Sequence, residues 1–443
     1  MRTFKIGGVH PEENKFARNM AYETFPLPKQ AVVFLNQHLG TPAKAMVTKG
    51  EHVKVGQLIG RGEAFISAHV HAPVSGTVAK VELIADISGY RKEAIVIDVE
   101  NDEWADGIDT SSDLISDIRL TRNEIVERIK ACGIVGLGGA CFPTHVKYMF
   151  PTDKKVDYLL INAAECEPYI TTDNRMMLEK AEACLTGIEA LLIASGAPQA
   201  IIGIEHNKPD AVTHLMHAAK NHPKIKIMPL RTKYPQGAEK QLIKSLVDRI
   251  VPNGKLPLDV GVIVNNIATT HAVYEAVQKN KPLVETYMTV TGKQLQNRKN
   301  YRVRIGTSIM EILNSVGIPE NTGKIISGGP MMGKAIANLD AYAVKGMSSL
   351  LLMDESESVR GEIHNCLRCG KCVTACPMGL EPNMLQPLAE RKRYEDCERY
   401  GIMNCIECGS CAYGCPSNRS LLDYIRVGKV QTGALIRSRQ AQQ

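Results

Sequence analysis

Eight cysteines near the carboxyl end of the 443-residue chain form a pattern that occurs twice. Each copy has three cysteines separated by two residues and a fourth cysteine directly before a proline. Three thiolates at this spacing can wrap one 4Fe-4S cluster, while the fourth points to the other cluster. The spacing therefore predicts two clusters, with the ligand sets Cys366, Cys369, Cys372, Cys415 and Cys405, Cys408, Cys411, Cys376.

Structural zinc and disulfide bonds are the alternative uses of such cysteines. A zinc site usually takes two cysteine pairs separated by a longer loop, whereas this chain packs four thiols into a short span and repeats it. Gly370 and Gly409 follow the second cysteine of each copy, where a tight turn leaves backbone N–H groups free for cluster sulfurs. We therefore expect iron–sulfur clusters.

A glycine-rich loop earlier in the chain is suited to a bound nucleotide. It contains Gly136, Gly138, Gly139 and Phe142 and is followed by Lys147. Glycines let backbone N–H groups approach a phosphate, and the lysine can supply charge. The loop lacks the G-x-G-x-x-G fingerprint and no strong strand precedes it, so a Rossmann site is not indicated. By itself the loop is equally compatible with a simple tight turn.

Three polar loops follow apolar runs that read as strands. Asn162, Glu165 and Glu167 form the first, whose carboxylates could accept hydrogen bonds from ribose or ribityl hydroxyls, or could form an acidic turn at a helix N-terminus. The other two loops contribute Tyr234, Gly237, Glu239 and Asn265, Asn266, Thr269. Ligands gather at the carboxyl ends of strands in an α/β sheet, so we expect the four loops on one edge.

The order of apolar runs predicts a multi-domain chain of α/β and α+β class. Short β-branched runs with glycine turns come first, and longer runs after residue 120 are each followed by a helical stretch. Charged linkers are expected at 101–120 and 354–363. The predicted parts are an N-terminal arm and small β-barrel at 1–100, an α/β domain at 120–282, an α+β module at 283–352, a helical cluster domain at 364–425 and a C-terminal tail at 426–443.

Composition restricts the class of protein. The net charge of +6 is spread along the chain without a basic stripe, which argues against nucleic-acid binding. We find no run of eighteen apolar residues and no secretion signal, so we expect no membrane span. Of 13 cysteines, eight belong to the repeated pattern, and the odd set of five that remains indicates a reducing cytoplasm.

Three smaller features have competing interpretations. The basic stretch from Arg419 onward reads as a solvated tail, with an acidic partner or an anionic lipid surface as the alternative. Cys397 is expected in a packed core. His69 and His71 could ligate a metal, but alternate positions in a strand favour a polar face.

The four loops, in this order, resemble the flavin- and NADH-binding subunit of respiratory complex I over about residues 120–352, including the ubiquitin-like SLBB fold after Leu283. The whole chain, from the Gly7–Lys15 arm and a biotinyl/lipoyl-like barrel to the paired clusters, resembles the RnfC subunit of the Rnf electron transport complex. No lysine sits at a hairpin tip of the barrel, so we interpret that part as a docking element. The resemblance implies that FMN and NAD(H) bind at Gly136, Gly138, Gly139, Phe142, Lys147, Asn162, Glu165, Glu167, Tyr234, Gly237, Glu239, Asn265, Asn266 and Thr269.

The loops depart from the complex I pattern at five positions. The residues are Leu137 in place of Arg, Cys141 in place of Gly, Ala164 in place of Asp, Cys166 in place of Ser and Ala238 in place of Glu. The lost charges change how a nucleotide is held, and Cys141 would crowd a backbone that lies close to the dinucleotide.

A flavin can exchange a hydride with NADH and single electrons with the clusters. The resemblance implies a ferredoxin:NAD+ oxidoreductase subunit that lies peripherally on the cytoplasmic side of the bacterial inner membrane. Its implied partners are the other Rnf membrane subunits and the iron–sulfur subunit RnfB, and electron transfer would drive Na+ or H+ transport. The alternatives are a soluble flavin and iron–sulfur cobalamin reductase, and a non-catalytic two-cluster electron carrier.

Overall fold

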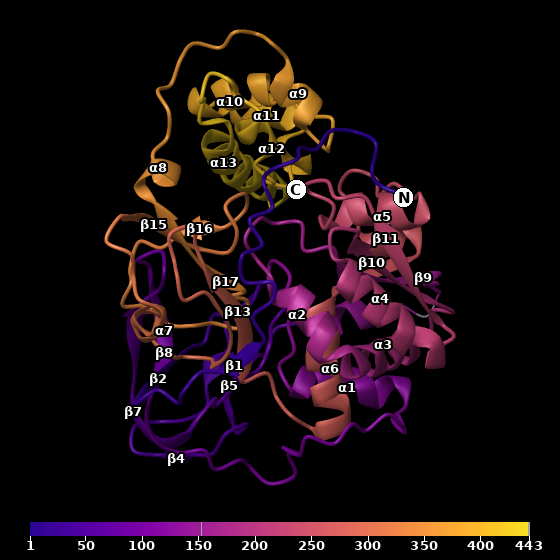
Figure 1. Ribbon diagram of the computed structural model, residues 1–443, viewed down its shortest axis with the longest axis vertical. Helices are drawn as coiled ribbons and strands as arrows, with labels where there is room; N and C mark the ends of the chain where they lie inside the picture. The colour runs from indigo at the N-terminus through magenta and orange to yellow at the C-terminus, as the bar shows by residue number, and fades with distance from the viewer. Residues whose placement is uncertain (152, 442–443) are drawn as a thin grey trace.

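The computed structural model describes residues 1–151 and 153–441. The N-terminal β domain and the α/β domain lie side by side, and the helical cluster domain lies at one end of the molecule (Figure 1). Residues 1–15, which we call the amino-terminal strap, run past both the α/β domain and the cluster domain (Figure 1). None of the helices in the described ranges is both long and apolar enough to cross a bilayer.

Two small antiparallel sheets form the N-terminal β domain, with the strand orders β2-β8-β7-β4 and β3-β5-β6. Side chains alternate between the faces of a strand, and Val33, Val78, Ile95 and Ile97 point into a fully buried core. The strands are β2 (Gln30–Phe34), β3 (Lys44–Ala45), β4 (His52–Val53), β5 (Leu58–Arg61), β6 (Val70–His71), β7 (Ser75–Ala85) and β8 (Arg91–Asn101).

His71 contradicts the expectation of a polar strand face, because it is only 6% exposed. The side chain lies against the backbone of Ala131, at the interface between the N-terminal β domain and the α/β domain. Burial is also the first cause of a strongly lowered His71 pKa.

The α/β domain is built on a parallel sheet with the order β11-β10-β9-β12. Its helices α3 and α6 pack closely, since a Cβ at Gly187 would lie 2.0 Å from the Thr270 carbonyl oxygen. The strands are β9 (Tyr158–Ala163), β10 (Ala200–Glu205), β11 (Ile225–Leu230) and β12 (Val262–Asn266). The helices are α1 (Arg122–Ala131), α2 (Thr172–Glu179), α3 (Ala181–Ser195), α4 (Pro209–Ala218), α5 (Glu239–Val247) and α6 (Ile267–Lys279), with 3-10 turns η1 (Thr144–Tyr148), η2 (Ala219–Asn221) and η3 (Pro257–Val260).

The α+β module contains a mixed sheet that also takes in a strand from the beginning of the chain. The strand order is β1-β14-β13-β17-β15-β16, and β1 (Tyr22–Thr24) pairs in parallel with β14. The buried face of α7 packs beneath the sheet through Ile309, Ile312 and Leu313. The other elements are β13 (Glu285–Thr291), β14 (Lys299–Arg304), α7 (Ile309–Val316), β15 (Thr322–Ser327), β16 (Lys334–Ala335) and β17 (Ser349–Asp354).

The cluster domain is helical, as expected, and Cys397 is fully buried in its core. Gly370 and Gly409 adopt left-handed conformations that start α9 and α12. The elements are α8 (Glu355–Ser358), α9 (Lys371–Ala375), α10 (Pro382–Glu390), α11 (Tyr394–Arg399), η4 (Ile402–Asn404), α12 (Ser410–Tyr413) and α13 (Leu421–Ala441).

The predicted C-terminal tail at 426–443 is wrong, because α13 continues through Ala441 as part of the cluster domain. The helix buries Ile425, Gly428 and Thr432. A Cβ at Gly428 would lie 2.6 Å from the Cβ of Ala389, so this glycine permits close packing of α13 on α10. Among its basic residues, Lys429 donates to the Cys405 carbonyl at 2.6 Å inside the cluster domain, whereas Arg437 and Arg439 are exposed.

Candidate nucleotide site and cysteine groups

The predicted loops meet at one edge of the parallel sheet. Strands β9, β11 and β12 run in the same direction, so the chain leaves Ala163, Leu230 and Asn266 at the same edge. The glycine-rich loop that precedes η1 also reaches this edge, where the Leu137 N–H donates to Thr269 Oγ1 at 3.0 Å. Tertiary structure therefore brings all four loops together.

The glycine-rich loop presents backbone N–H groups that make no hydrogen bond within the described part of the chain. Gly138 and Gly139 are exposed, and their N–H groups donate to no acceptor among the described residues. A Cβ at Gly138 would lie 2.7 Å from Asn266 Nδ2, whereas a Cβ at Gly139 would meet nothing within 4 Å. Lys147 Nζ donates to the Val264 carbonyl at 2.6 Å, and burial lowers the pKa of this lysine. Free backbone N–H groups in a glycine-rich loop fit a phosphate group.

Two of the predicted site residues, Asn162 and Gly237, contact each other at the same edge of the sheet. The Asn162 amide donates to the Gly237 carbonyl at 2.8 Å, and a Cβ at Gly237 would lie 3.2 Å from Asn162 Oδ1. The Gly237 N–H donates to Cys166 Sγ at 3.3 Å, and burial raises the pKa of that thiol. A larger residue at position 237 would therefore have to displace the Asn162 and Cys166 side chains by a few tenths of an ångström.

The consecutive asparagines after β12 have different roles. Asn265 is buried and donates to the Tyr148 hydroxyl at 2.5 Å. Asn266 caps α6 by accepting a hydrogen bond from the Ala268 N–H at 2.8 Å, and it donates to Asp173 Oδ2 at 2.7 Å. Asn265 thus holds the glycine-rich segment to the sheet, and Asn266 links two helix N-termini.

Glu165 forms the helix N-terminal turn that was the alternative to ligand binding. Its Oε1 accepts from the N–H groups of Asp173 at 2.7 Å and Asn174 at 3.3 Å, at the start of α2. Burial, followed by the charge of Glu165, raises the pKa of Asp173 to about 7. Glu165 Oε2 and both amide atoms of Asn174 are buried and make no hydrogen bond within the described part of the chain. Glu165 Oε2 is ion-paired with Lys15 Nζ at 3.7 Å, so the Asn174 amide is the polar group left for a bound hydroxyl.

Glu167 points away from the sheet edge toward the α+β module. It accepts from the backbone N–H groups of Met331 at 3.2 Å and Met332 at 2.8 Å, and from the Tyr234 hydroxyl at 3.3 Å. Burial raises the Glu167 pKa to about 7. The Tyr234 hydroxyl also donates to the Cys408 carbonyl at 2.8 Å. Both residues therefore contact neighbouring domains, which the sequence pattern did not indicate.

The remaining predicted residues lie around the glycine-rich loop. The Gly136 N–H donates to the Phe142 carbonyl at 2.9 Å and closes the loop. Glu239 is exposed in the first turn of α5, near enough to Lys147 for its charge to favour the protonated lysine.

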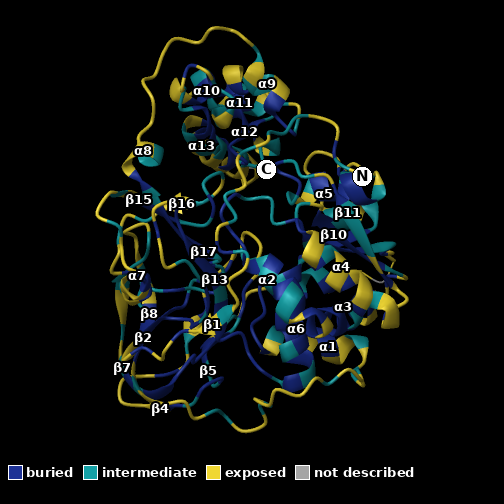
Figure 2. Ribbon diagram, viewed as in Figure 1, coloured by how far each residue is buried: buried dark blue, intermediate teal, exposed yellow. Residues whose placement is uncertain are grey.

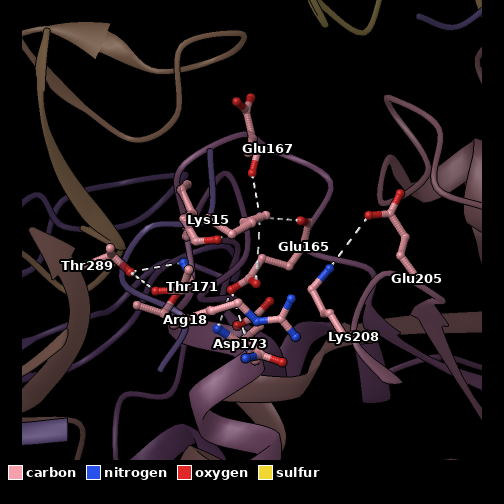
Figure 3. A network of polar contacts seen from close by, with 12 residues as sticks. Lys15, Arg18, Glu165, Glu167, Thr171, Asp173, Glu205, Lys208 and Thr289 are labelled. Carbon is pink, nitrogen blue, oxygen red and sulfur yellow. Dashed lines mark hydrogen bonds and ion pairs between the residues drawn. The ribbon is translucent and has the colours of Figure 1, made fainter. Parts of the chain in front are cut away.

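A buried polar network beneath the loops contains residues that sequence reasoning missed (Figure 3). Lys15, from the amino-terminal strap, donates to the carbonyls of Glu165, Glu167 and Ile170 at 2.8, 2.8 and 2.6 Å. The sequence feature that could have revealed Lys15 is its position at the end of the Gly7–Lys15 segment. The other missed residues are Asp173, Glu205 and Lys208.

Glu205 and Lys208 form a buried pair at the end of β10, with Nζ 3.7 Å from Oε2. Lys208 Nζ also donates to the Ala164 carbonyl at 2.7 Å. With Lys15, this lysine supports both ends of the loop after β9 (Figure 3).

The Cys141 thiol lies 3.8 Å from the carbonyl of Gly139, so it contacts the glycine-rich loop and also faces the α+β module. The residue has a positive φ of 53°, and its thiol is directed toward Gly346, where a Cβ would lie 2.0 Å from Cys141 Sγ. Burial raises the pKa of the Cys141 thiol to about 11. The substitution is therefore accommodated at the boundary with the α+β module.

Four cysteines of the two runs surround one cavity in the cluster domain. Its walls include Cys376, Cys405, Cys408 and Cys411. We call these four residues the inner cysteine group. One thiol from the first run joins three from the second, and thiols around a cavity of this kind fit an iron–sulfur cluster.

The other four cysteines, Cys366, Cys369, Cys372 and Cys415, are called the outer cysteine group. Burial raises the pKa of Cys372, and the nearby Cys415 thiol adds to this rise. The segment leading to Cys366 is tied to the segment after Cys415, because the His364 N–H donates to the Ser417 carbonyl at 3.1 Å. The two segments that carry this group are thus held together.

Family models match three separate parts of the chain. Residues 3–103 match the RnfC barrel sandwich hybrid domain, residues 129–275 match the Nuo51 FMN-binding domain, and residues 359–416 match the 4Fe-4S dicluster domain. These matches agree with the predicted barrel, flavin-binding and two-cluster parts.

Relatives match the chain over nearly its full length. The C component of the proton-translocating ferredoxin:NAD(+) oxidoreductase complex of Clostridium ljungdahlii is 42% identical, over 98% of this chain and 95% of the relative. The C component of the Na(+)-translocating complex of Acetobacterium woodii is 40% identical, over 96% of each chain. The C component of the ion-translocating oxidoreductase complex of Rhodobacter capsulatus is 36% identical, over 91% of this chain and 78% of the relative.

Among solved structures, an NAD+-reducing [NiFe]-hydrogenase in its H2-reduced state shares the fold. The TM-score is 0.50 at 18% identity, over 70% of this chain and 61% of that one. The hydrogenase shares the fold alone, whereas the nearly full-length relatives show the family. The chain belongs to the RnfC family, whose members are subunits of ion-translocating ferredoxin:NAD(+) oxidoreductase complexes.

Proposed function

We propose that this chain is the nucleotide-handling subunit of an ion-translocating complex that transfers electrons between ferredoxin-derived carriers and NAD(H). The observation that carries the proposal is that four loops meet at one sheet edge. This edge is in direct contact with the domain that holds the two four-cysteine runs. The full-length relatives support this function over a soluble cobalamin reductase or a non-catalytic carrier.

FMN and NAD(H) are proposed to bind at the four loops. Bound FMN would supply hydride exchange with the nicotinamide and single-electron exchange with the clusters. The free N–H groups of Gly138 and Gly139 and the Lys147 ammonium would hold a phosphate, while Asn162 and Glu165 lie in or directly after β9 at the same edge. No side chain is required as a covalent nucleophile.

The inner and outer cysteine groups are proposed to ligate one 4Fe-4S cluster each. The proposed partners are the iron–sulfur subunit RnfB and the membrane subunits of the complex, and the chain would lie peripherally on the cytoplasmic face of the inner membrane. The relatives that support these assignments belong to complexes with proton or sodium translocation in their names.

The proposed function is tested by anaerobic reconstitution. We expect about eight irons, eight sulfides and one FMN per chain, with bleaching of both flavin and cluster absorbance on addition of NADH. Eight irons with no flavin, and no response to NADH even after FMN is supplied, would contradict the function.

Gly139→Ala tests where the flavin binds. Because a Cβ at Gly139 meets no protein atom within 4 Å, the apoprotein should unfold at the same urea concentration as the wild type. The methyl group would occupy the space beside the free N–H groups, so FMN affinity should fall about tenfold or more. Gly254→Ala is the control, since Gly254 precedes η3 at the opposite end of β12 from the loops. Its φ of +71° means that this variant should lose some stability but keep the wild-type FMN affinity. Unchanged FMN affinity in Gly139→Ala would remove this loop from the site.

A further inference from the structure

The two cysteine groups lie in different environments. Within the inner group Cys376, Cys408 and Cys411 are buried, whereas Cys366 and Cys369 of the outer group are exposed. The segment 359–369 that leads into the outer group is exposed at every residue and forms the long loop at the end of the molecule (Figure 2). A cluster in the inner group would be enclosed, and one in the outer group would face solvent.

The α/β domain touches the inner group directly. The buried Tyr234 hydroxyl donates to the carbonyl of Cys408 at 2.8 Å. Gln241 on α5 donates to the Pro377 carbonyl at 3.1 Å, one residue after Cys376. Both contacts start from the loop and helix that follow β11, so they join the nucleotide edge to the inner cysteines.

The amino-terminal strap completes this junction. The Gly8 N–H donates to the Ala375 carbonyl at 2.9 Å, and Val9 exchanges two backbone hydrogen bonds of 2.9 Å with Tyr234. Gly7 has a φ of +66°, and a Cβ there would lie 2.4 Å from the carbonyl carbon of Cys376. The strap therefore runs between the nucleotide loop and the Cys376 segment with no room for a larger residue.

We propose that the inner group carries the cluster that exchanges electrons with the nucleotide site. The outer group carries the cluster that exchanges electrons with a partner protein. The strap, together with Tyr234, sets the distance between the flavin and the inner cluster. The proposal rests on the function proposed above. In the NADH-oxidising direction, one hydride carries two electrons to the flavin. These electrons leave singly through the inner and then the outer cluster, so two one-electron acceptors are reduced and one proton is released per NADH. The reverse sequence forms NADH from NAD+, a proton and two electrons.

Loss of one cluster at a time tests the order. Cys408→Ser and Cys369→Ser should each lower the iron content from about eight to about four. In Cys369→Ser, NADH should still bleach the remaining cluster as fast as it does in the wild type. In Cys408→Ser, NADH should bleach the flavin while the remaining cluster stays oxidised. The opposite pattern in the two variants would overturn the proposal.

Solvent access provides a readout that needs no NADH. A soluble dysprosium chelate added to the dithionite-reduced protein should enhance the electron spin relaxation of the cluster that remains in Cys408→Ser. The cluster that remains in Cys369→Ser should respond much less, because its cysteines are enclosed. Equal enhancement in both variants would contradict the inner and outer assignment. If NADH fails to bleach the wild-type flavin, the proposed function fails, and this experiment still decides which cluster is enclosed and which faces solvent.

Gly7→Ala tests the strap while leaving all eight cluster thiols in place. The new Cβ must displace the Cys376 segment, so reduction of the clusters by NADH should slow about tenfold or more, while flavin reduction, flavin content and iron content stay at wild-type values. Hydrogen exchange at the Gly8 and Val9 N–H groups should become faster in the same variant. Gly254→Ala is matched in backbone strain, with a φ of +71° and no atom near its Cβ, and should change none of these quantities. Wild-type cluster reduction in Gly7→Ala would show that the strap does not set the distance.

Discussion

Replacing Lys15 with methionine should destabilise the protein by about 3–5 kcal/mol. The Lys15 side chain is 10% exposed, and its ammonium lies 3.7 Å from Glu165 Oε2 and donates to three backbone carbonyls of the loop after β9. Without it, the Glu165 carboxylate keeps its charge in a buried place, and the three carbonyls lose their donor. The loop after β9 would lose its fixed conformation.

The effect is measured as the free energy of unfolding in anaerobic urea titrations, together with the FMN content after reconstitution. We expect the FMN content to fall with the stability, because Glu165 and Asn162 belong to the same loop. Lys5→Met is the matched control in the strap, since Lys5 is exposed and its loss should change the stability by less than about 0.5 kcal/mol. Equal stability of the two variants would show that the Lys15 network is energetically neutral.

Lys345 should make the stability of the protein depend on pH above neutrality. Its side chain is 1% exposed and donates to the carbonyls of His69 and Gly133, both at 2.7 Å, so it joins the α+β module to the β domain and the α/β domain. Burial lowers the pKa of this lysine from 10.5 to about 7. The unfolded chain therefore binds one more proton than the folded protein between pH 7 and about 10.5.

Because the unfolded state binds more protons in this range, the free energy of unfolding rises with pH. Between pH 7 and 9 the contribution of Lys345 should be about 2 kcal/mol. Lys345→Met should remove this rise, although it also lowers the stability at every pH by leaving two carbonyls unpaired. Lys334→Met, at an exposed position, should keep the wild-type slope. A slope unchanged in Lys345→Met would contradict the lowered pKa.

Local sequence determined the chemistry of the clusters and the order of the parts. Cluster ligation depends on thiol spacing within a few residues, and strand or helix formation depends on periods of two or 3.6 residues, so both are visible in the chain itself. The glycine-rich loop and the strand-end asparagines were found for the same reason. The expectation that Cys376 and Cys415 each join the cluster of the other run follows from the ligation rule for two repeated runs.

The tertiary structure decided which predicted residues face a ligand and which hold the domains together. Tyr234 contacts a carbonyl 174 residues away, Lys15 contacts carbonyls about 150 residues away, and Lys345 contacts one 276 residues away. Nothing in their local sequence distinguishes them from exposed residues, because only long-range packing removes a lysine or tyrosine from water and supplies its partners. Helix α13 was missed for a related reason: the glycine at position 428 lowers helix propensity locally, and only close contact with Ala389 explains its presence.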